Sequence, residues 1–155
     1  MLEIVETTPS LIPIARELFL EYANSLDFSL SFQSFNEELA SLPGEYAPPR
    51  GFILLALKDS EAAGCVAMRP LDSSVAEMKR LYVRQRYQGS RIGRMLVSEL
   101  VERATRIGYR KIRLDTVPSM KAAINLYLSM GFYPIAPYRE NPIPGTAYLE
   151  KDLRS

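Results

Sequence analysis

A segment rich in arginine and glycine has the composition of an anion-binding turn. It lies within residues 84–94 and includes Gln88-Gly89-Ser90-Arg91-Ile92-Gly93-Arg94. A helix that begins here would present free backbone N–H groups and the positive end of its dipole, and glycine lets a phosphate approach the backbone closely. The same pattern also occurs in plain connections between a strand and a helix. It therefore leaves a phosphate site and a structural turn as alternatives.

Two side chains, Glu77 and Tyr127, have the chemistry for proton transfer. The chain has no histidine, which excludes Ser-His-Asp and Cys-His catalysis. A glutamate can act as a general base through water or after burial raises its pKa. A phenol of pKa ~10 can donate a proton to a leaving group whose conjugate acid has a similar pKa. Glu77 could instead pair with Lys79 or Arg80, and Tyr127 could be an ordinary core residue.

The strands that must position Glu77 are predicted from hydrophobic alternation and intervening turns. They cover residues 2–6, 52–57, 62–68, 75–83, 111–115 and 146–152. The strands between 52 and 83 form an antiparallel meander, and a crossover helix should make 111–115 parallel to 75–83. Alternation along this last strand predicts one face with Glu77, Lys79, Leu81 and Val83, and the other with Met78, Arg80 and Tyr82.

The helices that must position the turn and Tyr127 are predicted from helical periodicity and from capping residues. They cover residues 10–26, 34–42, 90–107 and 119–130. The expected N-caps are Ser10, Ser34 and Ser119, with Ser34 in a capping box. Gly108 is placed for the left-handed turn that ends the third of these helices.

Length and charge bound the class of protein. The 155 residues, of which 47% are hydrophobic, predict a single domain over residues 1–155 with a sizeable core. The net charge of +1 provides no overall field for nucleic acid or an anionic membrane. No apolar run approaches the roughly 20 residues of a membrane span, and the N-terminus lacks the basic start of a signal peptide. A cytoplasmic location is therefore expected.

The cysteine content also fits a cytoplasmic location. The only cysteine, Cys65, lies in an apolar run, where a buried structural thiol is expected rather than a nucleophile. One cysteine excludes a disulfide within the chain, which fits a reducing compartment. Without histidine, a zinc site would need carboxylates alone, so no metal is expected.

From Gly51 to Phe132, the order and spacing of these segments resemble the cofactor-binding core of the GCN5-related N-acetyltransferase (GNAT) family. That family has the motif Gln/Arg-x-x-Gly-x-Gly/Ala, which Gln88 and Gly93 match and Arg91 does not. The resemblance implies a mixed α/β fold, with a largely antiparallel, splayed sheet of six to seven strands flanked by about four helices. It also implies acetyl transfer from acetyl-coenzyme A to a primary amine of a small molecule or peptide, by direct attack in a ternary complex.

The resemblance also assigns roles to residues. It implies that Tyr127, in Leu126-Tyr127-Leu128-Ser129-Met130-Gly131-Phe132, protonates the thiolate and that Glu77 is the base. The cofactor contacts that it implies are Leu81, Tyr82, Val83, Gln88, Gly89, Ser90, Arg91, Ile92, Gly93, Arg94 and Ser119. At Arg91, a negative φ would keep the backbone donor in place, and the guanidinium would either assist a phosphate or crowd it.

The acceptor side of such a site is less specified. The residues expected there are Phe28, Phe32, Phe35, Glu37, Glu38, Tyr46, Tyr138, Arg139 and Asn141. Aromatic rings with scattered carboxylates suit a small cationic amine, and they equally suit a core beneath a lid. The same scaffold could alternatively serve as a non-catalytic acyl-coenzyme A sensor or interaction module. Pairing of exposed sheet faces into a homodimer is left open, and no nucleic acid or membrane partner is expected.

Overall fold

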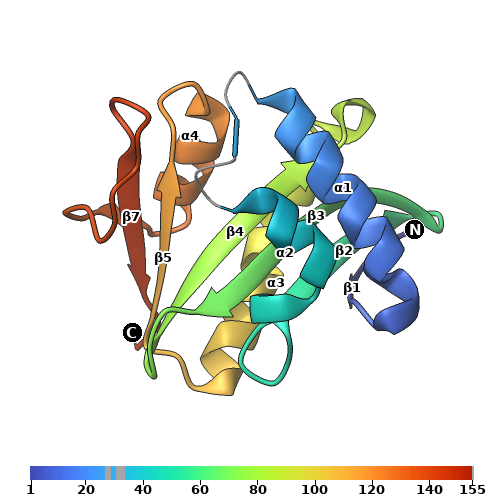
Figure 1. Cartoon of the computed structure of the whole chain (residues 1–155), viewed down its shortest axis with the longest axis horizontal. Helices are drawn as coiled ribbons and strands as arrows, with labels where there is room; N and C mark the ends of the chain where they lie inside the picture. Colours follow the sequence, from blue (N-terminus) through green and yellow to red (C-terminus); the bar gives the residue numbers. More distant parts are fainter. Residues whose placement is uncertain (27–28, 31–33, 155) are drawn as a thin grey trace.

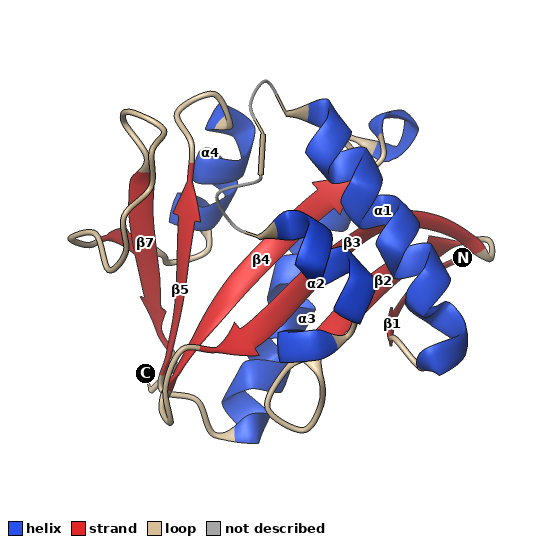
Figure 2. Ribbon diagram, viewed as in Figure 1, coloured by secondary structure: helices blue, strands red, loops and turns tan. Residues whose placement is uncertain are grey.

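The computed structural model describes residues 1–26, 29–30 and 34–154, which build one sheet with helices on both faces (Figure 1 and Figure 2). The strands are β1 (Leu2–Glu6), β2 (Phe52–Lys58), β3 (Glu61–Pro70), β4 (Val75–Val83), β5 (Lys111–Thr116), β6 (Tyr133–Pro134) and β7 (Ala147–Asp152). The α-helices are α1 (Ile12–Ser25), α2 (Phe35–Ser41), α3 (Ile92–Ile107) and α4 (Lys121–Ser129). Short 3₁₀ turns are η1 (Pro9–Leu11), η3 (Gly44–Tyr46) and η4 (Gln85–Tyr87).

The sheet is splayed between its two central strands. Its order is β1-β2-β3-β4-β5-β7-β6, and every neighbouring pair is antiparallel except β4 and β5. These two parallel strands pair only over residues 75–77 and 111–113 and then separate toward α4 (Figure 1). The predicted mixed α/β fold, with a largely antiparallel, splayed sheet and four α-helices, is confirmed.

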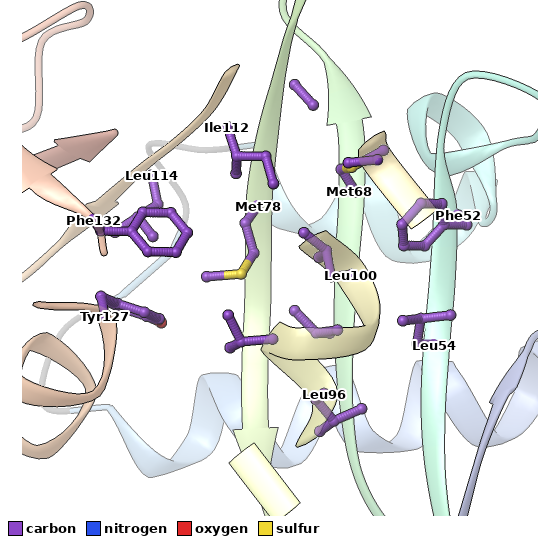
Figure 3. Close-up of a cluster of buried hydrophobic side chains, with 14 of the residues drawn as sticks. Phe52, Leu54, Met68, Met78, Leu96, Leu100, Ile112, Leu114, Tyr127 and Phe132 are labelled. Carbon is purple, nitrogen blue, oxygen red and sulfur yellow. The ribbon is translucent and has the colours of Figure 1, made fainter. Parts of the chain in front are cut away.

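Two hydrophobic cores lie on opposite faces of the sheet. On one face, α3 and α4 cover strand residues that include Met68 and Ile112, and α3 contributes Leu100 to this core (Figure 3). On the other face, α1 and α2 cover strand residues that include Leu55, and α1 contributes Phe19 to this core. The apolar stripe of α3 explains why this helix lies flat on the sheet, and Gly108 ends it with the expected left-handed conformation (φ 111°).

The predicted N-caps are wrong at all three serines. Helix α1 follows the turn η1, in which the Leu11 N–H donates to the Thr8 carbonyl (2.9 Å), so the chain enters the helix without needing the Ser10 hydroxyl. Ser34 has a left-handed backbone (φ 56°), which prevents the extended geometry of a capping box. Ser119 lies one residue before the N-cap position of α4, which Met120 occupies.

The predicted alternation along β4 is also wrong beyond Lys79. One residue of β3, Val66, faces two residues of β4, and Arg80 adopts a positive φ of 64°, which together define a β-bulge. The extra residue reverses the alternation. Leu81 therefore joins Met78 on the α3 face, whereas Arg80 shares the α1–α2 face with Glu77 and Lys79.

Cys65 lies in the core under α1, fully buried, and burial raises the pKa of its thiol. The prediction of a structural thiol fits this environment. In the described part of the chain, no helix combines the length and the apolar character needed to cross a membrane. A cytoplasmic location and a homodimer stay predictions.

Candidate active site

A cavity of about 50 Å³ lies where β4 and β5 separate. Side chains from several separate parts of the chain line it, including Tyr22, Lys79, Leu81, Asp115, Tyr127 and Asn141. The β-bulge at Arg80 lies three residues beyond Glu77, the last β4 residue paired with β5, and a bulge bends the strand that carries it. The cavity is large enough for a small polar group, so a ligand could enter between the strands.

Tyr127 reaches this opening from α4. Its ring packs against Phe132 with centroids 5.7 Å apart and points from α4 toward β4 (Figure 3). The side chain is buried in the α3 face core, and burial raises the pKa of its phenol. Among the described residues, none forms a hydrogen bond with its hydroxyl. The ring therefore belongs to the core, and Tyr127 also lines the cavity.

Glu77 is fully buried and surrounded by donors. Its Oε1 accepts hydrogen bonds from Arg69 Nε (3.0 Å) and Arg139 Nη2 (2.9 Å), and its Oε2 accepts one from the Tyr138 hydroxyl (2.7 Å). Burial alone would raise the pKa of Glu77, but Lys79, Arg139 and Arg69 outweigh burial and hold that pKa below its usual value. A general base needs the opposite shift. This environment favours the alternative of an ion-paired structural carboxylate, in which the charge of Lys79 contributes as expected and Arg69 and Arg139 are further partners.

The segment between β4 and α3 forms the predicted turn. Gln88 Nε2 donates to the Val83 carbonyl (3.1 Å) and so ties the turn to the end of β4. No side chain caps α3, so the N–H groups of Ile92, Gly93 and Arg94 face outward without an intrahelical acceptor. The Arg94 guanidinium donates to the Ser129 hydroxyl (2.7 Å), which joins α3 to α4. An open helix start therefore sits beside the end of β4.

The backbone of Arg91 lacks the negative φ that would keep its N–H donor in place. Its φ is 67°, not negative, and it follows Gly89, whose φ is 84°. A left-handed conformation costs a residue with a side chain about 1–2 kcal/mol relative to glycine. This explains physically why glycine suits this position of the motif. The Arg91 side chain is exposed, as are Gln88 and Ser90.

The remaining predicted cofactor contacts lie along β4 and before α4. Leu81, Tyr82 and Val83 belong to the part of β4 that has lost its β5 partner, so this edge can pair with a linear ligand. Ser119 is exposed on the turn before α4 and does not line the cavity, where Met120 takes its place. A Cβ atom built on Gly93 would lie 3.6 Å from Leu126 and 3.8 Å from Val83, so the turn, β4 and α4 meet at Gly93.

The acceptor-side candidates divide into two groups. Phe35, Glu38 and Tyr46 serve the structure: Glu38 pairs with Arg80 (2.8 Å), and both rings are buried in the α1–α2 face core. Tyr138, Arg139 and Asn141 lie on the loop before β7 and anchor it to the carboxylates of β4 and β5. Glu37 is exposed. Phe28 and Phe32 lie outside the described residues.

Lys79 and Asp115 are two charged cavity residues that sequence reasoning did not assign to the site. Lys79 was considered only as a partner for Glu77, and Asp115 only as the end of a strand. A carboxylate at the carboxyl end of a parallel strand is a signal that could have found Asp115, because ligands bind at such ends in parallel sheets. Within the described ranges, no three His, Cys, Asp or Glu side chains gather as metal ligands would.

Comparison with known proteins supports the fold and the family. The sequence profile of the Acetyltransferase (GNAT) family matches residues 12–132. An uncharacterized N-acetyltransferase of Schizosaccharomyces pombe is 38% identical over 138 residues, covering 88% of this chain and 85% of the relative. An uncharacterized N-acetyltransferase of Dictyostelium discoideum is 28% identical over 186 residues, covering 81% and 86%.

Solved structures agree. A GNAT family acetyltransferase from Staphylococcus aureus superimposes with a TM-score of 0.80 at 19% identity, covering 99% of this chain and 100% of the other. One from Elizabethkingia anophelis with acetyl-CoA bound superimposes with a TM-score of 0.72 at 23% identity, covering 97% of each. The splayed sheet, the open start of α3 and the buried Tyr127 thus occur in a chain that belongs to the GNAT family of acetyltransferases, with acetyl-coenzyme A as co-substrate.

Proposed function

We propose that this protein transfers the acetyl group of acetyl-coenzyme A to a primary amine by direct attack in a ternary complex. The observation that carries the proposal is the opening between β4 and β5, which has Tyr127 on its α4 side and polar side chains on the other. A thioester laid along the unpaired edge of β4 would be accessible to an amine entering from the α1–α2 face.

The residues present fit the cofactor in three places. The N–H groups at the start of α3 suit the pyrophosphate, because a helix start combines free donors with a favourable dipole. The unpaired edge of β4 near Leu81 suits the amide groups of the pantetheine arm. Tyr127 lines the same cavity as Leu81, and it follows Leu126, which lies 3.6 Å from a Cβ atom built on Gly93. In this arrangement, the exposed hydroxyl of Ser119 would contact the nucleotide part of acetyl-coenzyme A.

The transfer balances with one acid on the protein. The acceptor ammonium first loses a proton, and the amine nitrogen then bonds to the thioester carbon as the carbon–sulfur bond breaks. The departing sulfur takes the proton of Tyr127, and the acetylated nitrogen returns its second proton to the phenolate. One proton is released to solvent overall. Burial raises the pKa of Tyr127, so the phenol carries its proton until the thiolate departs.

Acetyl-coenzyme A should stabilise the protein against unfolding. At about 100 times its dissociation constant, a ligand that binds only the folded state adds about 2.7 kcal/mol, and each kcal/mol raises Tm by about 2–4 °C in a chain of this size. Gly93→Leu should fold but lose the shift, because its side chain would fill the meeting point of the turn, β4 and α4. Gly93→Ala is the matched control, since its Cβ makes only ordinary contacts and should leave a shift.

Thermal melts with and without millimolar acetyl-coenzyme A test this prediction. A wild-type protein whose Tm does not move would contradict the proposed function at its first step. A shift without acetylation of any amine would instead favour the non-catalytic sensor.

Substitutions of Arg91 should distinguish the effect of backbone strain on stability from the effect of the side-chain charge on cofactor binding. Arg91→Gly removes the cost of the left-handed conformation and should raise the free energy of unfolding by up to about 1 kcal/mol. Arg91→Ala keeps that conformation and should not. If the guanidinium assists a phosphate, Arg91→Ala weakens acetyl-coenzyme A binding, whereas Arg91→Gly compensates by opening the backbone. Denaturant unfolding and calorimetric titration measure the two effects. Tighter binding to Arg91→Ala would show that the side chain obstructs the site.

A further inference from the structure

Residues from both faces of the sheet line the cavity between β4 and β5. Leu114 of β5 belongs to the α3 face core together with Tyr127. Because side chains alternate along a strand, the next residue of β5, Asp115, points to the α1–α2 face. There it lines the cavity together with Tyr22 of α1. A phenol from one face and a carboxylate from the other therefore meet in the same cavity.

The loop before β7 orients the carboxylate of Asp115. Asn141 Nδ2 donates to Asp115 Oδ2 (3.2 Å), and Asn141 Oδ1 accepts from the Ile143 N–H (2.9 Å), so both ends of the amide are bonded. Across the described part of the chain, no other donor bonds to this carboxylate, whose side chain is half-buried. A carboxylate accepts about four hydrogen bonds. Asp115 is thus fixed through one oxygen and can bind a donor through the other.

Asp115 is also the carboxylate with access to the cavity. Among the described residues that line the cavity, it alone carries a carboxyl group. Two other carboxylates lie near β4, and both are already bound to cations: Glu77 accepts from two arginines and a tyrosine, and Glu38 pairs with Arg80. A cationic amine that enters the cavity would therefore meet an anion at Asp115.

We propose that Asp115 binds the ammonium of the acceptor and receives the proton that this group must lose, and that Asn141 is the positioning residue that orients Asp115. This inference rests on the proposed function and names the residues that recognise the amine at its site. The acceptors that it favours are amines that are cationic at neutral pH and carry the nitrogen on an unbranched carbon, because a cavity of about 50 Å³ has little room beyond the reacting group.

The proton transfer balances. One N–H bond of the ammonium breaks as an O–H bond to Asp115 forms, and the lone pair left on nitrogen bonds to the thioester carbon. Tyr127 protonates the departing sulfur, and Asp115 later releases its proton to solvent. The step needs no further reactant.

Other titratable groups face Asp115 and act on the same equilibrium. They are Lys79 and Arg80 of β4, Tyr22 of α1, Tyr127 of α4, Tyr138 of the loop before β7 and Tyr148 of β7. Burial raises the pKa of the four phenols, which therefore stay uncharged at neutral pH. Burial and the charge of Arg80 lower the pKa of Lys79 to about 8. The effect of a variant is therefore measured as a ratio to the wild type at each pH.

Asp115→Asn tests the assignment because it keeps the shape of the side chain and removes its charge. Thiol release from acetyl-coenzyme A is followed with ethylamine, phenethylamine and spermidine as acceptors, from neutral to alkaline pH. At neutral pH, the variant should lose about 10²–10⁴-fold in kcat/KM, the usual worth of a general base. The loss should shrink as pH rises toward the pKa of the amine, because more amine then arrives neutral. The Tm shift by acetyl-coenzyme A should be retained.

Trifluoroethylamine distinguishes proton removal from a structural effect. Its fluorine atoms make it a weak base that is uncharged at neutral pH, so Asp115→Asn should slow its acetylation much less than that of ethylamine. Equal losses for the two amines at every pH would overturn the inference and leave acetyl transfer standing. If no amine reacts with the wild type while acetyl-coenzyme A still raises Tm, the proposed function itself fails.

Asp152→Asn is the matched control. Asp152 lies on β7 opposite Lys111, at the end of β5 that is remote from Asp115, so this variant should keep the wild-type kcat/KM at every pH. If Asp115→Asn does not fold, Asp115→Ser replaces it in the same comparison.

Asn141→Ser tests the positioning role. Serine can still accept from the backbone N–H two residues on, but it is too short to donate to Asp115. The variant should lose about 10- to 100-fold in kcat/KM, the worth of a hydrogen bond to a charged group, with the same pH dependence as Asp115→Asn. In the Asp115→Asn background it should have little further effect. Losses that multiply in the double variant would show that Asn141 does not act through Asp115.

Discussion

Tyr127→Phe should bind acetyl-coenzyme A as tightly as the wild type and turn over about 10²–10⁴-fold more slowly, the usual worth of a general acid. The substitution keeps the ring that packs against Phe132 and removes only the hydroxyl at the opening. Since no described residue hydrogen-bonds that hydroxyl, its loss should not disturb the fold. Single-turnover release of the thiol measures the effect on the chemical step directly.

Tyr46→Phe provides the matched control. Tyr46 is another buried tyrosine, and its hydroxyl has no hydrogen-bond partner among the described residues. Removing that hydroxyl relieves an unsatisfied buried group, so stability should stay the same or rise, with turnover unchanged. If Tyr127→Phe were as fast as Tyr46→Phe while chemistry limits the rate, Tyr127 would be a core residue only, and water would be the acid.

Glu77→Gln should lower the free energy of unfolding by about 3–5 kcal/mol, because it leaves two arginines without their buried anion. Glu45→Gln is the control. Glu45 binds the same Arg69 (3.0 Å), but its side chain is 71% exposed, so its loss should cost less than about 1 kcal/mol. Denaturant unfolding of both variants gives the comparison, and equal, small losses would contradict the role of Glu77 as the anchor.

The pH dependence of Glu77→Gln distinguishes two roles of Glu77, that of a structural ion-pair partner and that of a general base. Because the folded-state pKa of Glu77 is lowered, its stabilisation is full above the unfolded pKa of ~4.3 and is lost as pH falls through the folded value. The wild type should therefore lose more stability than Glu77→Gln on acidification below that point. If Glu77 has only a structural role, the activity of Glu77→Gln should be lower than that of the wild type by the same factor at neutral and at alkaline pH. A loss that shrinks as pH rises toward the pKa of the amine would show that Glu77 is the base after all.

Most of the fold could be predicted because it depends on local patterns. The stripe along α3 and the glycine that ends this helix specify its length within two residues at the start. The central strands were found by alternation, and the parallel pair by the helix that connects them. The helix starts were wrong because a serine can cap only with an extended backbone, and the chain before each helix decides that backbone.

The candidate site also contains residues that local patterns could predict and residues whose environment they could not predict. Gln88, Gly93 and Tyr127 were recognised because each belongs to a short motif whose meaning does not depend on distant residues. The environment of Glu77 was not, because its partners come from β3 and from the loop before β7, eight to sixty-two residues away along the chain.

The sequence by itself determined the family, the position of the anion-binding turn and the helix that carries Tyr127, since these depend on residue types at fixed spacing. Only the tertiary structure decided which charged groups meet at the opening. A single extra residue at Arg80 reversed the faces of β4, and the register of β4 with β5 set Lys79 opposite Asp115. Strand register and bulges arise from packing between segments, so no periodicity within one segment can specify them.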